Sequence, residues 1–166
     1  RLFACGDPQN PNRLYWSQVP GDGKTIEDWD ANAALPAKSG GHVEIGDTRG
    51  DPIVGMVALA TQILIFKRFS VYRVQGTNPD NFRIERIDAE VERMSHDSIA
   101  MHGDVAYYLT PAGIYYFNNI TVQPLPNARN IQRFMRDAKV EISKGAECKD
   151  KLYFSCYVGD NPSGRN

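Results

Sequence analysis

The sequence predicts an all-β protein made of β-propeller-like repeats of antiparallel sheets, a partial propeller, with one short helix. Short runs rich in β-branched and aromatic residues recur along the chain, and turn-forming residues separate them. A similar pattern returns after about 42 residues, which is the length of a four-stranded propeller blade. A β-sandwich or β-barrel is the alternative architecture, because both also consist of short strands joined by turns.

The expected strands are the runs with the strongest β-forming composition. They are Arg1–Cys5, Arg13–Ser17, His42–Ile45, Ile53–Leu59, Ile63–Lys67, Val71–Val74, Phe82–Ile87, Val105–Leu109, Ile114–Phe117, Val140–Ile142 and Leu152–Val158. Turn chemistry supports the pairing of neighbours, since Pro111 and Gly113 lie between two tyrosine-rich runs where a hairpin needs a tight turn.

Two segments of the chain superimpose at the repeat distance. The first consists of Met56–Leu59, Ile63–Phe66 and Val71–Val74, and the second of Ser98–Met101, Val105–Tyr108 and Ile114–Phe117. Weaker copies of the pattern occur at Leu14–Ser17 and Gly145–Ser155. We therefore predict a single β-repeat region, 1–166, made of the approximate repeats 1–50, 51–94, 95–139 and 140–166. Because so few blades build only part of a ring, we expect the chain to be a fragment of a larger propeller, or an open fan whose last face meets another subunit.

One segment departs from the strand pattern and predicts a short amphipathic helix. In Asn127–Asp137, the apolar residues Ile131, Phe134 and Met135 have the spacing of one helical face, and Asn127 is suited to cap the first turn. We expect this helix to link two blades, and a partner-binding helix is the alternative.

Composition excludes several classes of function. The 166 residues carry 19 Lys and Arg against 20 Asp and Glu, a net charge of −1, which leaves no positive excess for non-specific nucleic-acid binding. No apolar run reaches the roughly 18 residues that a membrane span requires. The cysteines Cys5, Cys148 and Cys156 form no closed disulfide framework and no C-x-x-C pair, so we expect buried or half-buried thiols.

Two histidine segments suggest a hydrolase at first sight. His96-Asp97-Ser98 and His102-Gly103-Asp104 contain residue types of a catalytic triad. Triad residues, however, meet through the fold and not as sequence neighbours, and the chain has no G-x-S-x-G nucleophile elbow. We therefore interpret both segments as loops between blades and expect no catalytic residues.

Acidic and glycine-rich segments give no cofactor or metal prediction. The chain has carboxylates that could serve a glycosidase or a calcium site, but their spacing matches no EF-hand loop. They are Asp28, Asp30, Glu44, Asp47 and Asp51. Gly21–Thr25 ends like a phosphate-binding loop but lacks its first glycine. We expect no metal ligands and no cofactor-binding residues.

Several phrases along the chain resemble the propeller-type virion proteins of tailed bacteriophages, in the tail-hub or head-to-tail stabilisation class. They are Arg1-Leu2-Phe3, Asn12-Arg13-Leu14-Tyr15-Trp16-Ser17, Gly46-Asp47 with Gly50-Asp51-Pro52-Ile53, Leu64-Ile65-Phe66-Lys67, Ser70-Val71-Tyr72-Arg73-Val74-Gln75-Gly76 and Gly113-Ile114-Tyr115-Tyr116-Phe117. The resemblance spans Arg1 to about Asp137. It implies a non-enzymatic virion component, made in the bacterial host cytoplasm, that forms a homo-oligomer and contacts portal, adaptor or tail subunits.

Loops on a rigid frame are the expected contact sites. The candidate partner-contact residues are Asp28, Trp29, Asp30, Arg49, Asn78 and Asp80. The alternative function is a tail-associated propeller that binds or hydrolyses glycans, with exposed aromatic residues stacked on sugar rings. Clustering of Asp28, Trp29 and Asp30 with Glu44 in one cleft would favour that alternative.

Overall fold

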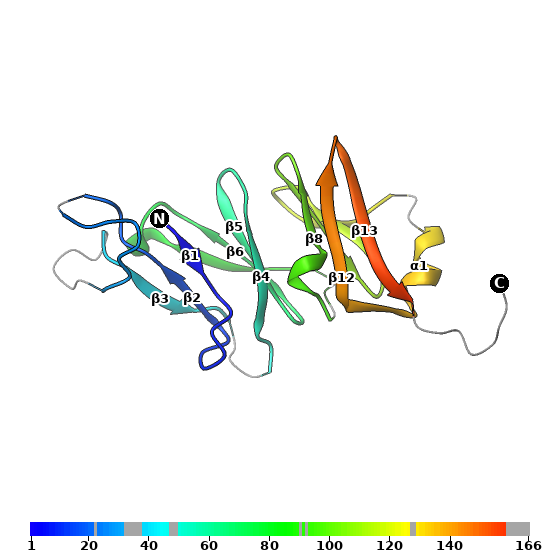
Figure 1. The fold of residues 1–166 in the computed structure, drawn as a ribbon, viewed down its shortest axis with the longest axis horizontal. Coiled ribbons are helices and arrows are strands. Elements are labelled where there is room, and N and C mark those ends of the chain that lie inside the picture. The colour runs from blue at the N-terminus through cyan, green and yellow to red at the C-terminus, as the bar shows by residue number, and fades with distance from the viewer. Residues whose placement is uncertain are drawn as a thin grey trace. The chain divides into compact units, whose positions relative to one another are not determined.

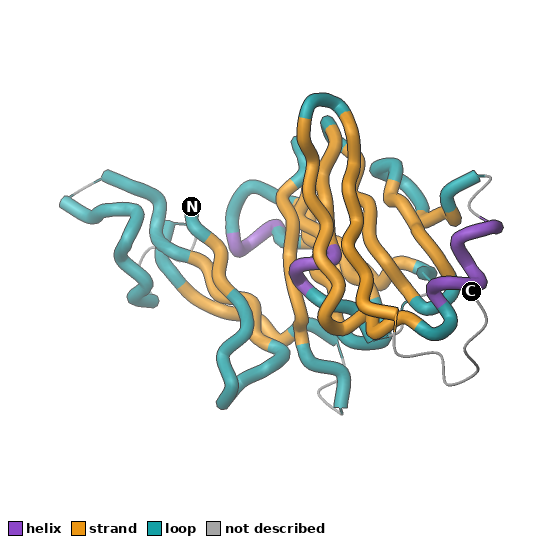
Figure 2. Tube along the Cα trace, turned by 45° about the vertical axis from the view of Figure 1, so that its right-hand side comes forward, coloured by secondary structure: helices purple, strands orange, loops and turns teal. Residues whose placement is uncertain are grey.

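The computed structural model describes residues 1–21, 23–31, 38–46, 50–89, 91, 93–126 and 129–158 (Figure 1). Its strands confirm the all-β class, and its α-helix α1 (Arg129–Met135) is short, as expected. The strands form four sheets, and none of those sheets is closed into a barrel in the described part of the chain. Loops rather than helices join most of the strands (Figure 2).

The chain divides into two compact units. The first comprises Arg1–Lys67 and Tyr72–Arg86, and the second comprises Arg68–Val71 and Ile87–Asn166. The first three sheets fall within the ranges 1–50, 51–94 and 95–139, and the fourth begins at Ala138, two residues before the predicted range 140–166. The arrangement of these sheets as propeller blades stays a prediction.

The first unit contains two sheets. One has the order β1-β2-β3 and consists of β1 (Phe3–Ala4), β2 (Arg13–Trp16) and β3 (Gly41–Glu44). The other has the order β4-β5-β6-β7 and consists of β4 (Ile53–Ala58), β5 (Gln62–Lys67), β6 (Val71–Gln75) and β7 (Arg83–Ile87), with the 3-10 helix η1 (Pro79–Asn81) before β7. Neighbours in each sheet are neighbours in sequence. Turns of a few residues join the strands from β4 to β6, whereas a long loop between Trp16 and Gly41 joins β2 to β3.

Side chains from both sheets build one core in this unit. The fully or nearly buried members are Leu14, Ile45, Ile53, Ile65 and Val74. Aromatic rings extend it, since the Phe82 ring lies 6.1 Å from that of Phe3 and 5.2 Å, edge-on, from that of Trp16. Alternate residues of β2 are buried, as expected for a strand with one face on the core.

A lysine is buried in this unit. Only 1% of Lys67 is exposed, at the end of β5. Its ammonium group donates a hydrogen bond of 2.8 Å to the backbone carbonyl of Ile45 and lies 5.7 Å from the centre of the Tyr72 ring. Lys67 therefore ties β5 to the residue that follows β3, and so joins the two sheets.

The loop between β1 and β2 is organised by the carboxylate of Asp7. Asp7 accepts hydrogen bonds from the side chains of Asn10 (2.9 Å) and Tyr15 (2.7 Å) and from the backbone of Gln9 (2.9 Å). Asn10, then Tyr15, then Gln9 stabilise the charged form and lower the pKa of Asp7 from 3.8 to about 2.

The lowered pKa predicts a pH-dependent contribution to stability. A carboxyl group whose pKa is lower in the folded state stabilises the fold above its unfolded pKa, and this stabilisation is lost as the pH falls from about 4 through 2. We therefore expect Asp7→Asn to lower the melting temperature at pH 7 and to differ little from the wild type at pH 2. Circular-dichroism melting at both pH values measures this, with the exposed Asp88→Asn as control. An equal loss at both pH values would contradict the assignment.

The second unit also contains two sheets. One has the order β11-β10-β9-β8 and consists of β8 (Ile99–His102), β9 (Val105–Thr110), β10 (Gly113–Phe117) and β11 (Val122–Pro124). The other is the long hairpin of β12 (Ala138–Cys148) and β13 (Lys151–Val158). The 3-10 helix η2 (His96–Ser98) leads into β8. β12 packs against η2 and β8, so the hairpin covers the sheet at its β8 edge.

A glycine allows the close approach of β12 to β8. A side-chain Cβ on Gly145 would lie 2.8 Å from the ring of Phe154 and 3.2 Å from the Cβ of Ala100 in β8. These separations are shorter than ordinary van der Waals contact, so only glycine fits without displacement. The core of the unit continues toward α1 through Leu109 and Val140.

The predicted helix forms, but its apolar face is only partly used. Met135 is 2% exposed and packs in the core of the second unit, whereas Ile131 is 38% and Phe134 is 65% exposed. Of the three residues predicted to form the apolar face, only Met135 is therefore buried. Asn127, the predicted cap, lies outside the described residues. The cysteine prediction is also wrong at one position, because Cys148 is exposed while Cys5 and Cys156 are half-buried.

Candidate functional site

The predicted contact residues Asp28, Trp29 and Asp30 lie in the loop between β2 and β3. The backbone of this segment is fixed on both sides: Gln18 donates to the carbonyls of Asp28 (2.7 Å) and Asp30 (3.0 Å), and Gly40 donates to that of Asp30 (3.0 Å). A Cβ on Gly40 would overlap the Trp29 backbone, so the backbone segments around these two residues are in close contact. The Trp29 side chain is 41% exposed on this fixed segment.

The other predicted contact residues occupy a second loop. Asp80 is exposed within η1, and Asn78 precedes that helix. The Asn81 side chain accepts hydrogen bonds from the backbones of Thr77 (2.9 Å) and Asn78 (3.0 Å) and so closes the turn. No hydrogen bond or ion pair joins this turn to residues 28–30, all of which are described. Arg49 lies outside the described residues.

The carboxylates considered for glycan hydrolysis are engaged locally. Asp28 accepts a hydrogen bond of 2.8 Å from the backbone of Thr25. Glu44 forms an ion pair of 2.6 Å with Arg13 on the neighbouring strand. No hydrogen bond joins Asp28, Asp30 and Glu44, all of which the structure describes.

The His96-Asp97-Ser98 segment forms η2, and its groups point to separate partners. Ser98 is fully buried, and its hydroxyl donates a hydrogen bond of 2.7 Å to the carbonyl of Ser95. Asp97 lies 3.8 Å from the ammonium group of Lys144 on β12. These contacts close the turn and attach it to β12, and the Ser98 hydroxyl has a structural partner.

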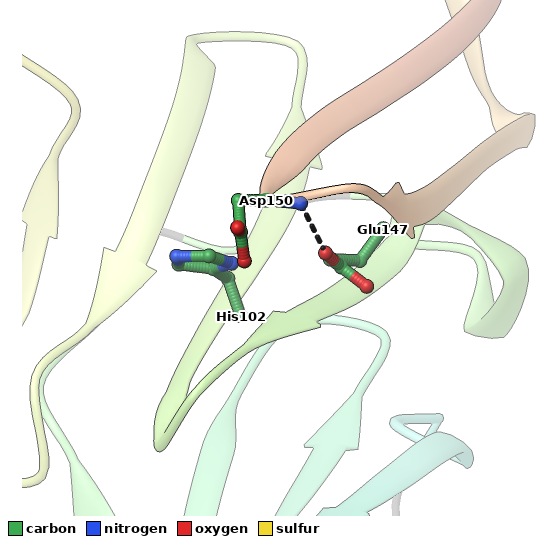
Figure 3. A group of neighbouring side chains, drawn as sticks. All are labelled: His102, Glu147 and Asp150. Carbon is green, nitrogen blue, oxygen red and sulfur yellow. Dashed lines mark hydrogen bonds between the residues drawn. The ribbon is translucent and has the colours of Figure 1, made fainter.

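Three side chains with metal-ligating atoms meet at the hairpin turns of the second unit (Figure 3). His102 ends β8, Glu147 lies near the end of β12, and Asp150 occupies the turn between β12 and β13. One imidazole nitrogen and one carboxylate oxygen from each acid all lie within 4.8 Å of one another. His102 is half-buried and both acids are exposed.

Turn geometry places these groups. The pairing of Cys148 with Lys151 leaves a two-residue turn, in which Lys149 (φ 52°) and Asp150 (φ 61°) both have left-handed backbones, as a type I′ hairpin requires. The backbone N–H of Asp150 donates a hydrogen bond of 2.9 Å to Glu147 Oε1, which holds that carboxylate beside the turn (Figure 3). His102 is the last residue of β8 and precedes the two-residue turn Gly103-Asp104, which leads into β9.

Sequence reasoning missed this group. His102 was expected in a loop between blades, and Glu147 and Asp150 were not candidates. The repeat carried an indirect signal, because the turn that follows His102 and the turn that contains Asp150 occupy corresponding places in successive copies. Packing of β12 against β8 then brings the two turns together.

The β12–β13 hairpin also exposes large apolar side chains that were not predicted as contact residues. These exposed hairpin residues are Ile142 (55%), Tyr153 (55%), Tyr157 (48%) and Val158 (46%). Leu152, Phe154 and Cys156 alternate with the exposed tyrosines and are half-buried. The run Leu152–Val158 thus has apolar or aromatic side chains on both faces of the strand, with Ser155 as its polar member, and apolar side chains on both faces are typical of a strand covered on both sides.

No helix among the described residues has the length and apolar character needed to cross a bilayer. Comparison with known proteins gives no family assignment, since no protein-family model matches the chain and no curated protein is significantly similar to it.

Proposed function

We propose that this chain is a non-enzymatic structural component of a bacteriophage or prophage-derived virion, a tail hub or head-to-tail connector that acts through protein–protein contacts. Its partners are other virion proteins, namely portal, adaptor or tail subunits, and further copies of itself. It is made in the bacterial host cytoplasm and resides in the virion. The blade-like sequence phrases quoted above point to this class of protein.

The observation that carries the proposal is the exposed, largely aromatic side of the β12–β13 hairpin. Tyrosine is enriched at protein interfaces because it contributes a large contact area with few rotatable bonds. Tyr153 and Tyr157 stand on one side of β13, about half exposed, and the ammonium group of Lys139 lies 5.2 Å from the Tyr157 ring. Trp29, on its fixed loop, offers a second apolar contact point.

Two successive four-stranded meanders give further support. Sheets β4-β5-β6-β7 and β8-β9-β10-β11 each follow the chain order, which is the strand order of a propeller blade. Repeated sheets of this kind form rigid frames on which loops and edges make contacts. The proposal therefore assigns the function to shape and contact surface.

Removing the exposed tyrosines tests this assignment. In Tyr153→Ser/Tyr157→Ser, we expect particle incorporation to fall by about tenfold or more, because loss of central aromatic contacts commonly costs an interface about 2 kcal/mol. Peptide mass spectrometry of gradient-purified particles measures incorporation of the full-length protein. Ile120→Ser is the matched control, since Ile120 is 73% exposed between β10 and β11, away from the β12–β13 hairpin in sequence.

Two outcomes would contradict the proposal. One is absence of the wild-type protein from purified particles. The other is retention of a glycan ligand or glycan hydrolysis by the free protein, which would favour the glycan-processing alternative. Equal melting temperatures of the double variant and the wild type show that the fold is intact.

A further inference from the structure

We propose that His102, Glu147 and Asp150 form a binding site for a divalent metal ion of the zinc type. This site is independent of the proposed virion function. The ion joins the turn of the β12–β13 hairpin to the end of β8. The proposal rests on the convergence of three ligand groups at two hairpin turns, one between β8 and β9 and the other between β12 and β13.

The charges of the group favour a cation. Glu147 and Asp150 place two carboxylates close together, and like charges at this separation repel each other. Neither acid forms an ion pair with a lysine or arginine in the part of the chain that the structure describes. Lys149 and Lys151 flank Asp150 in sequence and are exposed. A bound divalent ion compensates both carboxylates directly.

The donor set selects the kind of metal. One imidazole nitrogen and two carboxylate oxygens suit zinc and similar transition metals, whereas calcium and magnesium prefer oxygen ligands alone. Zinc binds such atoms at about 2.0–2.2 Å, which places tetrahedral ligands roughly 3.4 Å apart. The ligand atoms already lie within 4.8 Å of one another, and exposed carboxylates reach the shorter separation by side-chain rotation.

The backbone around the group is suited to hold it. Packing of β12 on β8, made close by Gly145, fixes the approach of the two strands. The hydrogen bond from the Asp150 backbone N–H to Glu147 Oε1 holds the Glu147 carboxylate beside the turn, where its oxygens are available to a metal ion. Three protein ligands leave the remaining coordination positions to water.

Isothermal titration of the full chain with ZnCl2 tests the site. We expect one saturable zinc ion per chain and a weaker response to CaCl2. His102→Ala and Asp150→Asn should each weaken zinc binding by about tenfold or more, because the first removes a ligand and the second removes the negative charge of one. Asparagine tolerates the left-handed backbone of position 150, so this variant keeps the turn.

Matched controls separate this site from adventitious binding. His96→Ala and Glu141→Gln change exposed groups of the same unit that lie outside the ligand group, and both should bind zinc as the wild type does. Cys148→Ser tests the exposed thiol next to Glu147 and should also retain binding. Metal-free melting curves confirm that each variant is folded.

The proposal is overturned if the wild type shows no saturable binding, or if His102→Ala and Asp150→Asn bind zinc as tightly as the wild type. Loss of binding in Cys148→Ser with retention in His102→Ala would assign the ion to the thiol instead. Neither result bears on particle incorporation, so failure of this proposal is distinguishable from failure of the proposed function.

Discussion

Leu14→Ala is expected to lower the free energy of unfolding by about 2–5 kcal/mol. Leu14 is fully buried on β2 and packs in the core that both sheets of the first unit share. Truncation removes the transfer free energy of the lost carbons and leaves a cavity that the surrounding side chains fill only partly. Chemical denaturation monitored by circular dichroism measures the change.

Leu2→Ala is the matched control for this variant. It removes the same atoms from a side chain that is 43% exposed, so the loss should be under about 1 kcal/mol. Similar losses in the two variants would contradict the placement of Leu14 in a shared core.

Lys67→Ala should have the second large effect, a loss of about 2–4 kcal/mol in the free energy of unfolding. The variant removes a buried aliphatic stem and leaves the carbonyl of Ile45 without the ammonium donor that lies 2.8 Å away. A buried polar group that loses its partner costs about 1–3 kcal/mol by itself. Denaturant titration measures the loss.

One further variant separates the contribution of the aliphatic stem from that of the charge, and a second serves as a control. Lys67→Met keeps most of the stem and should destabilise less than Lys67→Ala, since it also relieves the desolvation of the ammonium group. Lys24→Ala, at an exposed lysine, should change stability by under about 0.5 kcal/mol. A wild-type stability for Lys67→Ala would show that this lysine does not join the two sheets.

Local composition was sufficient to predict most strands of the fold. The apolar run Ile63-Leu64-Ile65-Phe66 predicted a strand, and Leu64, Ile65 and Phe66 are all fully buried in β5. β-branched and aromatic residues are enriched in strands because their side chains pack well on the covered face of a sheet.

The list of expected strands differs from the structure in several places. It lacks β8 and β11, although the repeat placed Ser98–Met101 in register with a strand. β11 contains a proline, which is tolerated there because β11 is an edge strand. The run Val140–Ile142 predicted three residues of β12, whereas the strand spans the 11 residues Ala138–Cys148. Its charged and small residues are weak β-formers individually, and pairing with β13 stabilises them in a strand.

The candidate sites depended on tertiary packing and were harder to predict. Trp29 lies in a loop, as expected, but the hydrogen bonds from Gln18 and Gly40 to the carbonyls of its neighbours Asp28 and Asp30 could be found only in the fold. His102, Glu147 and Asp150 belong to turns that meet only because β12 packs on β8. Such a meeting leaves no local spacing pattern, so motif matching does not find it.

The most direct test of the structural role is the native mass and negative-stain image of the full-length protein, purified from its particle or co-expressed with neighbouring virion proteins. If the protein is a virion scaffold, we expect a ring or a particle-bound assembly whose mass is well above the 18.6 kDa of one chain. A free monomer that binds or cleaves a glycan and joins no assembly would contradict it.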